Sequence, residues 1–409
     1  MAKRATSASS TPTSGDISIN EKAAVSRVTK MMAIPGKSGE EQAIAEFITD
    51  ELKKSGVPDA AIQFDSAHKK SHLGGQIGNL IVKLPGTVKG PRRLLMGHID
   101  TVPLCVGARP VRDGNLIRPK DSTTALGGDN RAGACVVLTT ALEILKRKLP
   151  HPPLTLLWPV QEEVGLVGAR HVSVAKLGKP KLSFNWDGGP PSMLVVGATG
   201  DVNIEVEVSG IASHAGAHPE DGVNAAAIAS LAIADLTRDG WHGLIQKGRN
   251  SGTSNIGAIN GGEATNVVMP NVHVRAEARS HDPKFRQKIV DQFRKAFERA
   301  ARELKNSAGK RGSISFVSRL KYESFKLDLH EPSVETAKSA MESLGMESLG
   351  MEPEYRISNG GLDANWMTAN GIPTVTMGCG QQGIHTVDEK LNIDSFLQAC
   401  RVAMKLATA

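Results

Sequence analysis

The sequence predicts an α/β protein with a smaller α+β domain inserted into it. Short apolar runs of strand length alternate with amphipathic helical patterns up to residue 199, as they do in α/β domains. Near Gly200 the pattern changes to alternating polar and apolar residues, which is typical of half-exposed antiparallel strands. Buried α/β patterns then return. We therefore assign residues 17–199 and 321–409 to the main domain, 200–320 to the insertion and 1–16 to a disordered tail.

The first part of the main domain begins with two helical patterns, and the first of these ends at Pro35 and Gly36. Strand-like runs and further helical patterns then alternate. The predicted helices are 20–32, 40–54, 132–145 and 168–177, and the predicted strands are 61–64, 79–84, 93–100, 154–160 and 181–186.

The insertion follows the order β-α-β-β-α-β, which predicts a four-stranded antiparallel sheet with two helices. Its predicted strands are 202–208, 254–259, 272–279 and 313–320, and its helices are 224–236 and 283–304. The final segment is expected to contain helices at 333–346, from 360 and at 393–406, and a strand at 373–378. The pentapeptide Met-Glu-Ser-Leu-Gly is repeated in tandem over Met341–Gly350, and we expect this duplication to be looped out at a helix end.

Composition excludes several classes of protein. The formal charge of +7 is spread along the chain and aromatic residues make up only 4% of it, so the basic stripe with stacking residues of a nucleic-acid binder is absent. No apolar run reaches the roughly 18 residues that suggest a membrane span. The four cysteines are widely spaced and indicate neither a disulfide framework nor a thiolate zinc site. We expect a cytoplasmic protein with no nucleic-acid or membrane partner.

The most informative stretch follows the apolar run Leu154–Val160, which is succeeded by Gln161, Glu162 and Glu163. A buried strand that ends on two acids delivers them to the edge of a sheet, where ligands bind in α/β proteins. Adjacent strand residues point to opposite sides, so one glutamate could bind a metal while the other moves a proton. Taken alone, the pair favours a solvated acidic turn, because charged residues are usually exposed.

Two further segments place chemistry at predicted element ends. His98 and Asp100 close the strand 93–100, and a carboxylate two residues from a histidine can orient a metal-bound imidazole. A core histidine satisfied by a neighbour is the alternative. Asp129 lies just before the helix 132–145, where capping of the helix is the alternative to metal binding.

Asp187 ends the strand 181–186, and His385 lies in a loop after the strand 373–378. Four coincidences of acids or histidines with strand ends are hard to explain as solvated turns. Two imidazoles and several carboxylates without thiolates suit zinc, manganese or cobalt. If one carboxylate bridges two metal ions, these side chains are enough to hold both ions. Two such ions can activate a water molecule while a carboxylate that binds no metal carries the water's proton.

Four motifs follow one another in the chain: Met96–Pro103, Leu126–Gly133, Glu162–Ala169 and Asp187–Gly189. Together they resemble the motifs of the peptidase T-like (tripeptide aminopeptidase-like) branch of the di-zinc exopeptidase family. That family includes carboxypeptidase G, acetylornithine deacetylase and succinyl-diaminopimelate desuccinylase. The resemblance implies a zinc-exopeptidase-like catalytic domain with a mixed central sheet flanked by helices, and an inserted α+β lid domain with a four-stranded antiparallel sheet and two helices.

The resemblance also implies roles for individual residues. It assigns His98 and Asp187 to one metal, Glu163 and His385 to the other, Asp129 to the bridge between them, Asp100 to bracing His98, and Glu162 to general base catalysis. Two divalent ions are implied, with Zn²⁺ as first choice and Mn²⁺ or Co²⁺ as alternatives. They would activate the water that attacks the peptide.

In the insertion, His214 resembles the family's lid histidine, and Asn266 and Arg279 resemble the residues that receive the substrate's carboxylate. The fork of an arginine suits that task, although a surface hydrogen bond for His214 and a salt bridge for Arg279 are alternatives. In dimeric relatives the lid histidine reaches the partner's active site, so a homodimer through the lid is implied.

The resulting hypothesis is a metal-dependent exopeptidase that hydrolyses short peptides, most closely an aminopeptidase of the tripeptidase type. A deacylase or carboxypeptidase acting on N-acyl amino acids or dipeptides is the alternative, because sequence constrains the hydrolytic machinery more than the substrate pocket. A silent scaffold is disfavoured, since Glu162 and the ligand set are all present. Asn130 stands where peptidase T usually has a second aspartate, which weakens the assignment of the substrate.

Overall fold

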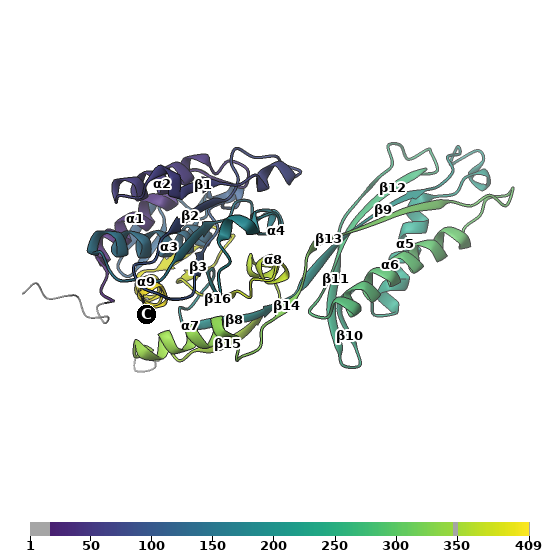
Figure 1. The fold of residues 1–409 in the computed structure, drawn as a ribbon. Helices are drawn as coiled ribbons and strands as arrows, with labels where there is room; N and C mark the ends of the chain where they lie inside the picture. Colours follow the sequence, from purple (N-terminus) through teal and green to yellow (C-terminus); the bar gives the residue numbers. More distant parts are fainter. Residues whose placement is uncertain (1–16, 347–350, 409) are drawn as a thin grey trace, which may run out of the picture. The chain divides into compact units, whose positions relative to one another are not determined.

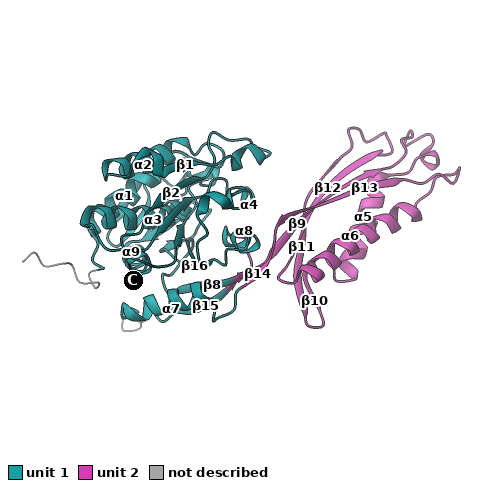
Figure 2. Cartoon of the chain, viewed as in Figure 1, with its two compact units in different colours: residues 1–196, 327–356, 362–409 teal, residues 197–326, 357–361 magenta. Residues whose placement is uncertain are grey.

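The computed structural model describes residues 17–346 and 351–408, and it divides into two compact units. Unit 1 comprises residues 1–196, 327–356 and 362–409, and unit 2 comprises residues 197–326 and 357–361 (Figure 2, teal and magenta). The predicted insertion, 200–320, falls within unit 2. The predicted tail at 1–16 and the part of the duplicated pentapeptide at 347–350 lie outside the described residues.

The long sheet that begins in unit 1 is mixed, as expected. Within the described residues it has nine strands in the order β1-β2-β6-β3-β7-β16-β8-β14, and β15 also pairs with β8. Strands β6, β3, β7 and β16 run parallel, whereas β1, β2 and β8 are antiparallel to their neighbours. The bounds are β1 (Ile62–Phe64), β2 (Leu80–Leu84), β3 (Arg93–Met96), β6 (Leu154–Trp158), β7 (Leu182–Trp186), β8 (Met193–Ala198), β14 (Phe325–Lys326), β15 (Glu354–Ser358) and β16 (Val375–Met377).

Helices cover both faces of this sheet in unit 1, which explains why nearly all residues of its parallel strands are buried (Figure 1). On one face, Leu94, Met96 and Leu157 pack with Ala169 and Met367. On the other, α3 packs on β3 and β7 and is itself covered by α1 and α9. The bounds are α1 (Glu21–Ala33), α2 (Gln42–Lys54), α3 (Gly128–Arg147), α4 (Val167–Arg170), α7 (Pro332–Ser343), α8 (Ala364–Ala369) and α9 (Ile393–Thr408).

A second, small sheet of unit 1 joins distant parts of the chain. Its strands run in the order β17-β18-β5-β4, with bounds β4 (Pro110–Asp113), β5 (Leu116–Pro119), β17 (Gln381–Gln382) and β18 (Lys390–Asn392). His385 lies in the loop between β17 and β18, and β5 precedes the segment that carries Asp129. Pairing of β18 with β5 therefore brings the C-terminal histidine loop next to the start of α3.

Unit 2 is an antiparallel sheet backed by two helices. Its strands run in the order β10-β11-β12-β9-β13, and α5 and α6 pack on the sheet and against each other. Alternate residues of β9 such as Ile204 and Val206 are buried, as the alternating pattern predicts. The bounds are β9 (Gly200–Ser209), α5 (Ala225–Arg238), β10 (Gly243–Lys247), β11 (Asn250–Gly261), β12 (Asn271–Ser280), α6 (Pro283–Glu303) and β13 (Ser313–Tyr322).

The fold class is confirmed, with one correction in unit 2. The prediction of a four-stranded sheet was one strand short, because the antiparallel sheet β10-β11-β12-β9-β13 has five strands within the described residues. The missed strand, β10, is short, and it pairs with the polar and glycine-containing first half of β11. That half, Asn250–Asn255, lacks the apolar alternation that indicates a strand. No helix in the described part of the chain is long and apolar enough to cross a membrane.

Candidate metal centre

Three neighbouring parallel strands carry the predicted ligands to one edge of the sheet in unit 1. Strands β6, β3 and β7 are adjacent and parallel, so their carboxyl ends lie side by side. The selected residues are His98 after β3, Glu162 and Glu163 after β6, Asp187 directly after β7, Asp129 at the start of α3, and His385 between β17 and β18. His98, the two glutamates and Asp187 lie in the turns that follow the strands and not on the strands' last residues.

Two glycines allow α3 to approach these strand ends. A Cβ added at Gly97 would lie 2.8 Å from the carbonyl carbon of Gly133, and one added at Gly133 would lie 2.0 Å from the backbone oxygen of Trp186. Real Cβ atoms essentially never lie so close to backbone atoms, so a larger residue would force the helix away. The start of α3, which carries Asp129, therefore packs directly against the ends of β3 and β7.

Asp129 lies between the two histidines. Its Oδ1 is 3.3 Å from His98 Nε2, and its Oδ2 is 3.2 Å from His385 Nε2. Glu163 Oε2 lies 3.0 Å from the same nitrogen of His385. One oxygen of Asp129 thus faces each imidazole, which is the arrangement expected of a carboxylate that can bridge two cations.

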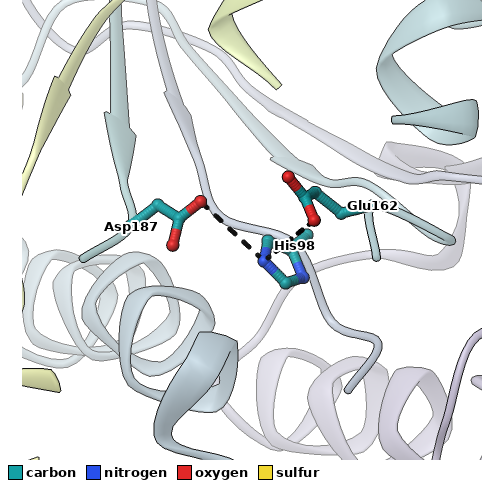
Figure 3. Close-up of side chains that lie close together, drawn as sticks. All are labelled: His98, Glu162 and Asp187. Carbon is teal, nitrogen blue, oxygen red and sulfur yellow. Dashed lines mark ion pairs between the residues drawn. The ribbon is translucent and has the colours of Figure 1, made fainter. Parts of the chain in front are cut away.

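Glu162 and Asp187 both point toward the ring of His98 (Figure 3). Glu162 Oε2 lies 4.0 Å and Asp187 Oδ2 lies 3.9 Å from His98 Nε2. Ligand atoms of these three residues lie within 4.8 Å of one another, as do those of His98, Asp129 and Glu163. His98 therefore belongs to two overlapping groups, each of which could hold a metal ion.

Two imidazoles determine the direction of the pKa shift of Asp129. Burial alone would raise its pKa, but the contacts with His385 and His98 outweigh burial and lower the pKa below its usual range. The contacts with Asp129 and Glu163 in turn raise the pKa of His385 to about 10. Burial works against charge on His98, yet Asp100 and Asp129 raise its pKa well above the ordinary value. The carboxylates of this region thus favour the protonated form of both imidazoles.

Negative charge is in excess around Glu162 and Asp187. Burial raises the pKa of Glu162 well above its ordinary value, and the nearby charges of Glu163 and Asp187 raise it further. Burial and then the charge of Asp129 do the same to the pKa of Asp187. Asp363 is another buried acid in this region. Burial raises its pKa to about 7. Among the described residues, neither of its carboxylate oxygens has a hydrogen-bond partner. The region has more acids than its imidazoles can neutralise.

Asp100 is a fully buried acid that holds three parts of the site. Its Oδ1 lies 3.2 Å from His98 Nδ1, so it can orient the imidazole. It accepts the backbone N–H of Glu162 at 3.0 Å and that of Glu163 at 3.2 Å, and the hydroxyl of Ser38 donates to it at 2.7 Å. Asp100 therefore fixes the ring of one candidate ligand and the backbone that carries both glutamates.

Comparison with known proteins shows the family of this chain. The model of peptidase family M20/M25/M40 matches residues 94–409, which is more than half of the chain. The chain belongs to this peptidase family. It is 30% identical over 390 residues to the uncharacterized protein YqjE of Bacillus subtilis, with 95% of this chain and 98% of that protein covered.

Two crystal structures are also similar to this member of the M20/M25/M40 family. One is of a tripeptidase from Staphylococcus aureus, with a TM-score of 0.84, and the other is of the aminopeptidase PepT from Bacillus cereus, with a TM-score of 0.82. Each is 29% identical to this chain and covers 95% of it and 98% of its own length. The resemblance to the peptidase T-like branch is therefore confirmed.

In this M20/M25/M40 peptidase, Glu389 holds the backbone around Asp129, although the sequence analysis did not select it. Glu389 is 1% exposed and accepts the backbone N–H groups of Leu126, Gly127 and Asp129 at 2.8, 2.8 and 2.9 Å. It follows His385 in an acidic turn, a context that predicts a solvated side chain. It directly precedes the short strand β18, and no sequence pattern distinguishes it from a solvated acid.

Gln381 is a second unselected residue, and it ties two ligand-bearing segments together. Its Nε2 donates to the backbone oxygen of Gly128 at 3.0 Å, beside Asp129. Its Oε1 accepts the N–H of Gly188 at 2.9 Å, beside Asp187. A single buried amide thus sets the spacing between the turns that carry these two acids.

Asn130, the departure from the peptidase T pattern, is a buried structural residue here. Its Nδ2 donates to the backbone oxygen of Trp186 at 2.8 Å. Its Oδ1 accepts from the N–H of Gly133 at 2.9 Å and from Nε2 of Gln381 at 2.8 Å. Both polar atoms of the side chain therefore make hydrogen bonds within the protein.

The predicted substrate residues lie in unit 2. His214 and Asn266 are exposed, and their loops join through a bridge between His214 and Val267 and a hydrogen bond from the Ala215 N–H to Asn266 O at 2.9 Å. The N–H groups of Gly216 and Ala217 both donate to Nδ1 of His214, at 3.2 and 3.0 Å.

Arg279 stands apart from this pair in its contacts. Its Nε and Nη2 donate to the two carboxylate oxygens of Glu277 at 2.9 and 3.0 Å, and Nη2 also lies 3.7 Å from Asp201. Its fork is thus engaged within unit 2, and its role in binding a substrate carboxylate stays a prediction.

Proposed function

We propose that this chain is a metal-dependent exopeptidase that removes the N-terminal residue from short peptides, in the manner of a tripeptidase. The observation that carries the proposal is the position of Glu162, a buried acid with a raised pKa beside a cluster of candidate metal ligands. The similarity to a tripeptidase and an aminopeptidase over 95% of the chain supports the choice of substrate class.

The donor set fits divalent cations. Imidazoles and carboxylates without thiolates suit zinc, with manganese or cobalt as alternatives. The acids around Glu162 and Asp187 exceed the local positive charge, and cations would relieve the electrostatic strain that raises their pKa values. We assign His98 and Asp187 to one ion, Glu163 and His385 to the second, and Asp129 to the bridge. Such ions, when bound, polarise a peptide carbonyl and acidify water.

Glu162 is the proton carrier in this proposal. Its carboxylate takes a proton from the water whose oxygen attacks the scissile carbonyl carbon, and the resulting acid gives that proton to the amine when the C–N bond breaks. A raised pKa suits both steps, because a general base works best when its pKa lies near the working pH. Asp100 keeps the base in place through the N–H of Glu162 and holds the ring of His98.

The remaining assignments are extensions of this proposal. His214, Asn266 and Arg279 are proposed to bind the substrate's oxyanion and carboxylate, with a homodimer formed through unit 2. We place the activity in the cytoplasm, which agrees with four free and buried cysteines.

A panel of substrates tests the proposal. The protein is loaded with Zn²⁺, Mn²⁺ or Co²⁺ and offered an unblocked tripeptide, the same tripeptide with an acetylated N-terminus, a dipeptide and an N-acyl amino acid. We expect release of the N-terminal residue from the unblocked tripeptide alone, loss of activity on chelation and recovery when the metal is returned. Cleavage of only the N-acyl amino acid would favour the deacylase alternative, and release of the C-terminal residue would favour a carboxypeptidase.

A further inference from the structure

We infer that Glu41 is a positioning residue that fixes the turn Gln161–Glu163 and so sets the reach of Glu162. The inference rests on the proposed function, in which Glu162 is the general base. Glu41 lies directly before α2, far from the metal centre in sequence, and its side chain reaches the turn after β6.

The contacts of Glu41 are those of a buried backbone anchor. The residue is 0% exposed, and its Oε1 accepts the N–H of Gly39 at 2.7 Å and the N–H of Gln161 at 3.1 Å. Its Oε2 is buried and has no hydrogen-bond partner among the described residues. A buried acid is costly to keep unless its contacts matter to the fold or the site, and the long-range contact of Glu41 is with the residue that precedes the base.

Gln161 needs such an anchor because of its backbone. Its φ is +55°, in the left-handed region that residues other than glycine seldom adopt, and the residue is fully buried. A conformation of this kind persists only where the surroundings hold it. The backbone N–H is held by Glu41, and the side-chain Nε2 donates to the backbone oxygen of Gly74 at 2.7 Å. A Cβ added at the neighbouring Gly75 would lie 2.5 Å from that Nε2, so the contact needs a glycine there.

Three consecutive N–H groups of the turn thus donate to buried carboxylates. Gln161 donates to Glu41, and Glu162 and Glu163 both donate to Asp100. Asp100 also contacts His98, so a change there disturbs the metal centre directly. Among the described residues, Glu41 makes no hydrogen bond or ion pair with a member of the metal centre. It is therefore the side chain through which the turn can be loosened without removing a ligand.

The test compares Glu41→Ala and Glu41→Gln with Glu46→Ala, which lies on the exposed side of α2 and serves as the matched control. The metal-loaded proteins are assayed on the unblocked tripeptide, and the bound metal is counted. In Glu41→Ala we expect kcat to fall about 100-fold, as for a misplaced catalytic group, with KM and metal content close to wild type. Glu41→Gln should regain most of kcat, because its amide oxygen can accept the same two N–H groups. Glu46→Ala should match wild type.

Hydrogen exchange of the metal-free proteins gives a readout that does not depend on activity. The amides of residues 161–163 should exchange faster in Glu41→Ala than in wild type, and at the wild-type rate in Glu41→Gln. If Glu41→Ala does not fold, Glu41→Asp replaces it, since the shorter side chain keeps the charge but cannot reach Gln161. Unchanged exchange at 161–163, or faster exchange with wild-type kcat, would overturn the inference while the proposed function stands. A wild-type protein that cleaves no tripeptide would instead reject the proposed function, and faster exchange in Glu41→Ala would still support the anchoring of the turn.

Discussion

The metal centre has two parts that treat the same kind of side chain in opposite ways. Asp129 and Asp187 are both largely buried, yet the pKa of Asp129 is lowered and that of Asp187 is raised well above the ordinary value. The difference is the number of imidazoles in reach: each oxygen of Asp129 faces a histidine at 3.2 or 3.3 Å, whereas Asp187 lies 3.9 Å from one ring. We call the first part the imidazole-rich half (His98, Asp129, Glu163, His385) and the second the acid-rich half (Glu162, Asp187, Asp363).

This contrast assigns different tasks to the halves. A carboxylate that stays ionised because imidazoles face it is suited to holding cations. An acid whose pKa is raised by burial and neighbouring charge is suited to exchanging a proton near neutral pH. Glu162 and Glu163 are adjacent in sequence, and burial raises the pKa of both, but only Glu163 contacts the ring of His385. They therefore offer the most direct way to test whether contact with the second imidazole separates a ligand from a proton carrier.

The largest expected effects come from this adjacent pair. Glu162→Gln should lower kcat by about 10²- to 10⁴-fold, the range that a general base contributes, and leave the metal content unchanged. Glu163→Gln should instead weaken metal binding, because it removes a carboxylate that contacts His385 at 3.0 Å. Steady-state kinetics on the tripeptide and metal counting on the same samples separate the two outcomes. Equal loss of metal in both variants would contradict the proposal that Glu163 binds metal while Glu162 carries the proton.

Removal of one imidazole should give the imidazole-rich half an excess of negative charge like that of the acid-rich half. In His385→Ala, Asp129 keeps only His98, so the local excess of negative charge grows and one ligand is lost. We expect the affinity for Zn²⁺ to fall by at least about 10- to 100-fold, the loss seen even when a residue behind a ligand is changed. Titration calorimetry measures it. His330→Ala removes an exposed histidine of unit 1 and should bind zinc as wild type does; a His385 variant that did the same would remove His385 from the site.

Much of this centre was accessible from sequence because its parts sit at element ends. The runs before His98, Glu162 and Asp187 are mostly apolar and of strand length, and mostly apolar runs of this length predict parallel strands buried on both faces. Once three such strands are assigned to one sheet, their carboxyl ends meet at one edge. The helices flanking them were equally predictable, since α1 and α2 follow the 3.6-residue period and end near the expected residues.

The residues that sequence did not reveal act through the backbone. Glu389, Gln381 and Glu41 are buried polar side chains whose partners are main-chain groups far away in the sequence. Main-chain N–H groups are the same at every position except proline, so no residue pattern marks which of them a distant side chain will bind. The strand β10 was not predicted for a related reason. Backbone hydrogen bonds to β11 hold it in the sheet, and β11 begins with polar residues and glycine, which do not indicate a strand.

Asp363 gives a smaller effect that depends on pH. Burial raises its pKa to about 7 in the metal-free protein, so the neutral acid is the form that the fold favours. Stability from this group is fully present below the pKa of the unfolded chain, near 3.8, and is lost as the pH rises through about 7. Asp363→Asn cannot ionise, so it should raise the melting temperature of the metal-free protein at pH 8 and change it much less at pH 4. Asp50→Asn, at an exposed position on α2, serves as the control and should show no such difference between the two pH values.

The smallest effect concerns Asn130, next to Asp129. Its Nδ2 donates to the backbone oxygen of Trp186, and an aspartate would place a second acceptor against that carbonyl and bury another negative charge in the imidazole-rich half. We expect Asn130→Asp to destabilise the protein by about 1–3 kcal/mol, the cost of a buried group left without its partner, and denaturant unfolding measures it. Asn250→Asp, at an exposed position, should be neutral. If Asn130→Asp were neutral too and improved turnover of tripeptides, position 130 would select the substrate, and the hydrogen bonds to Trp186, Gly133 and Gln381 would not be the reason for an asparagine there.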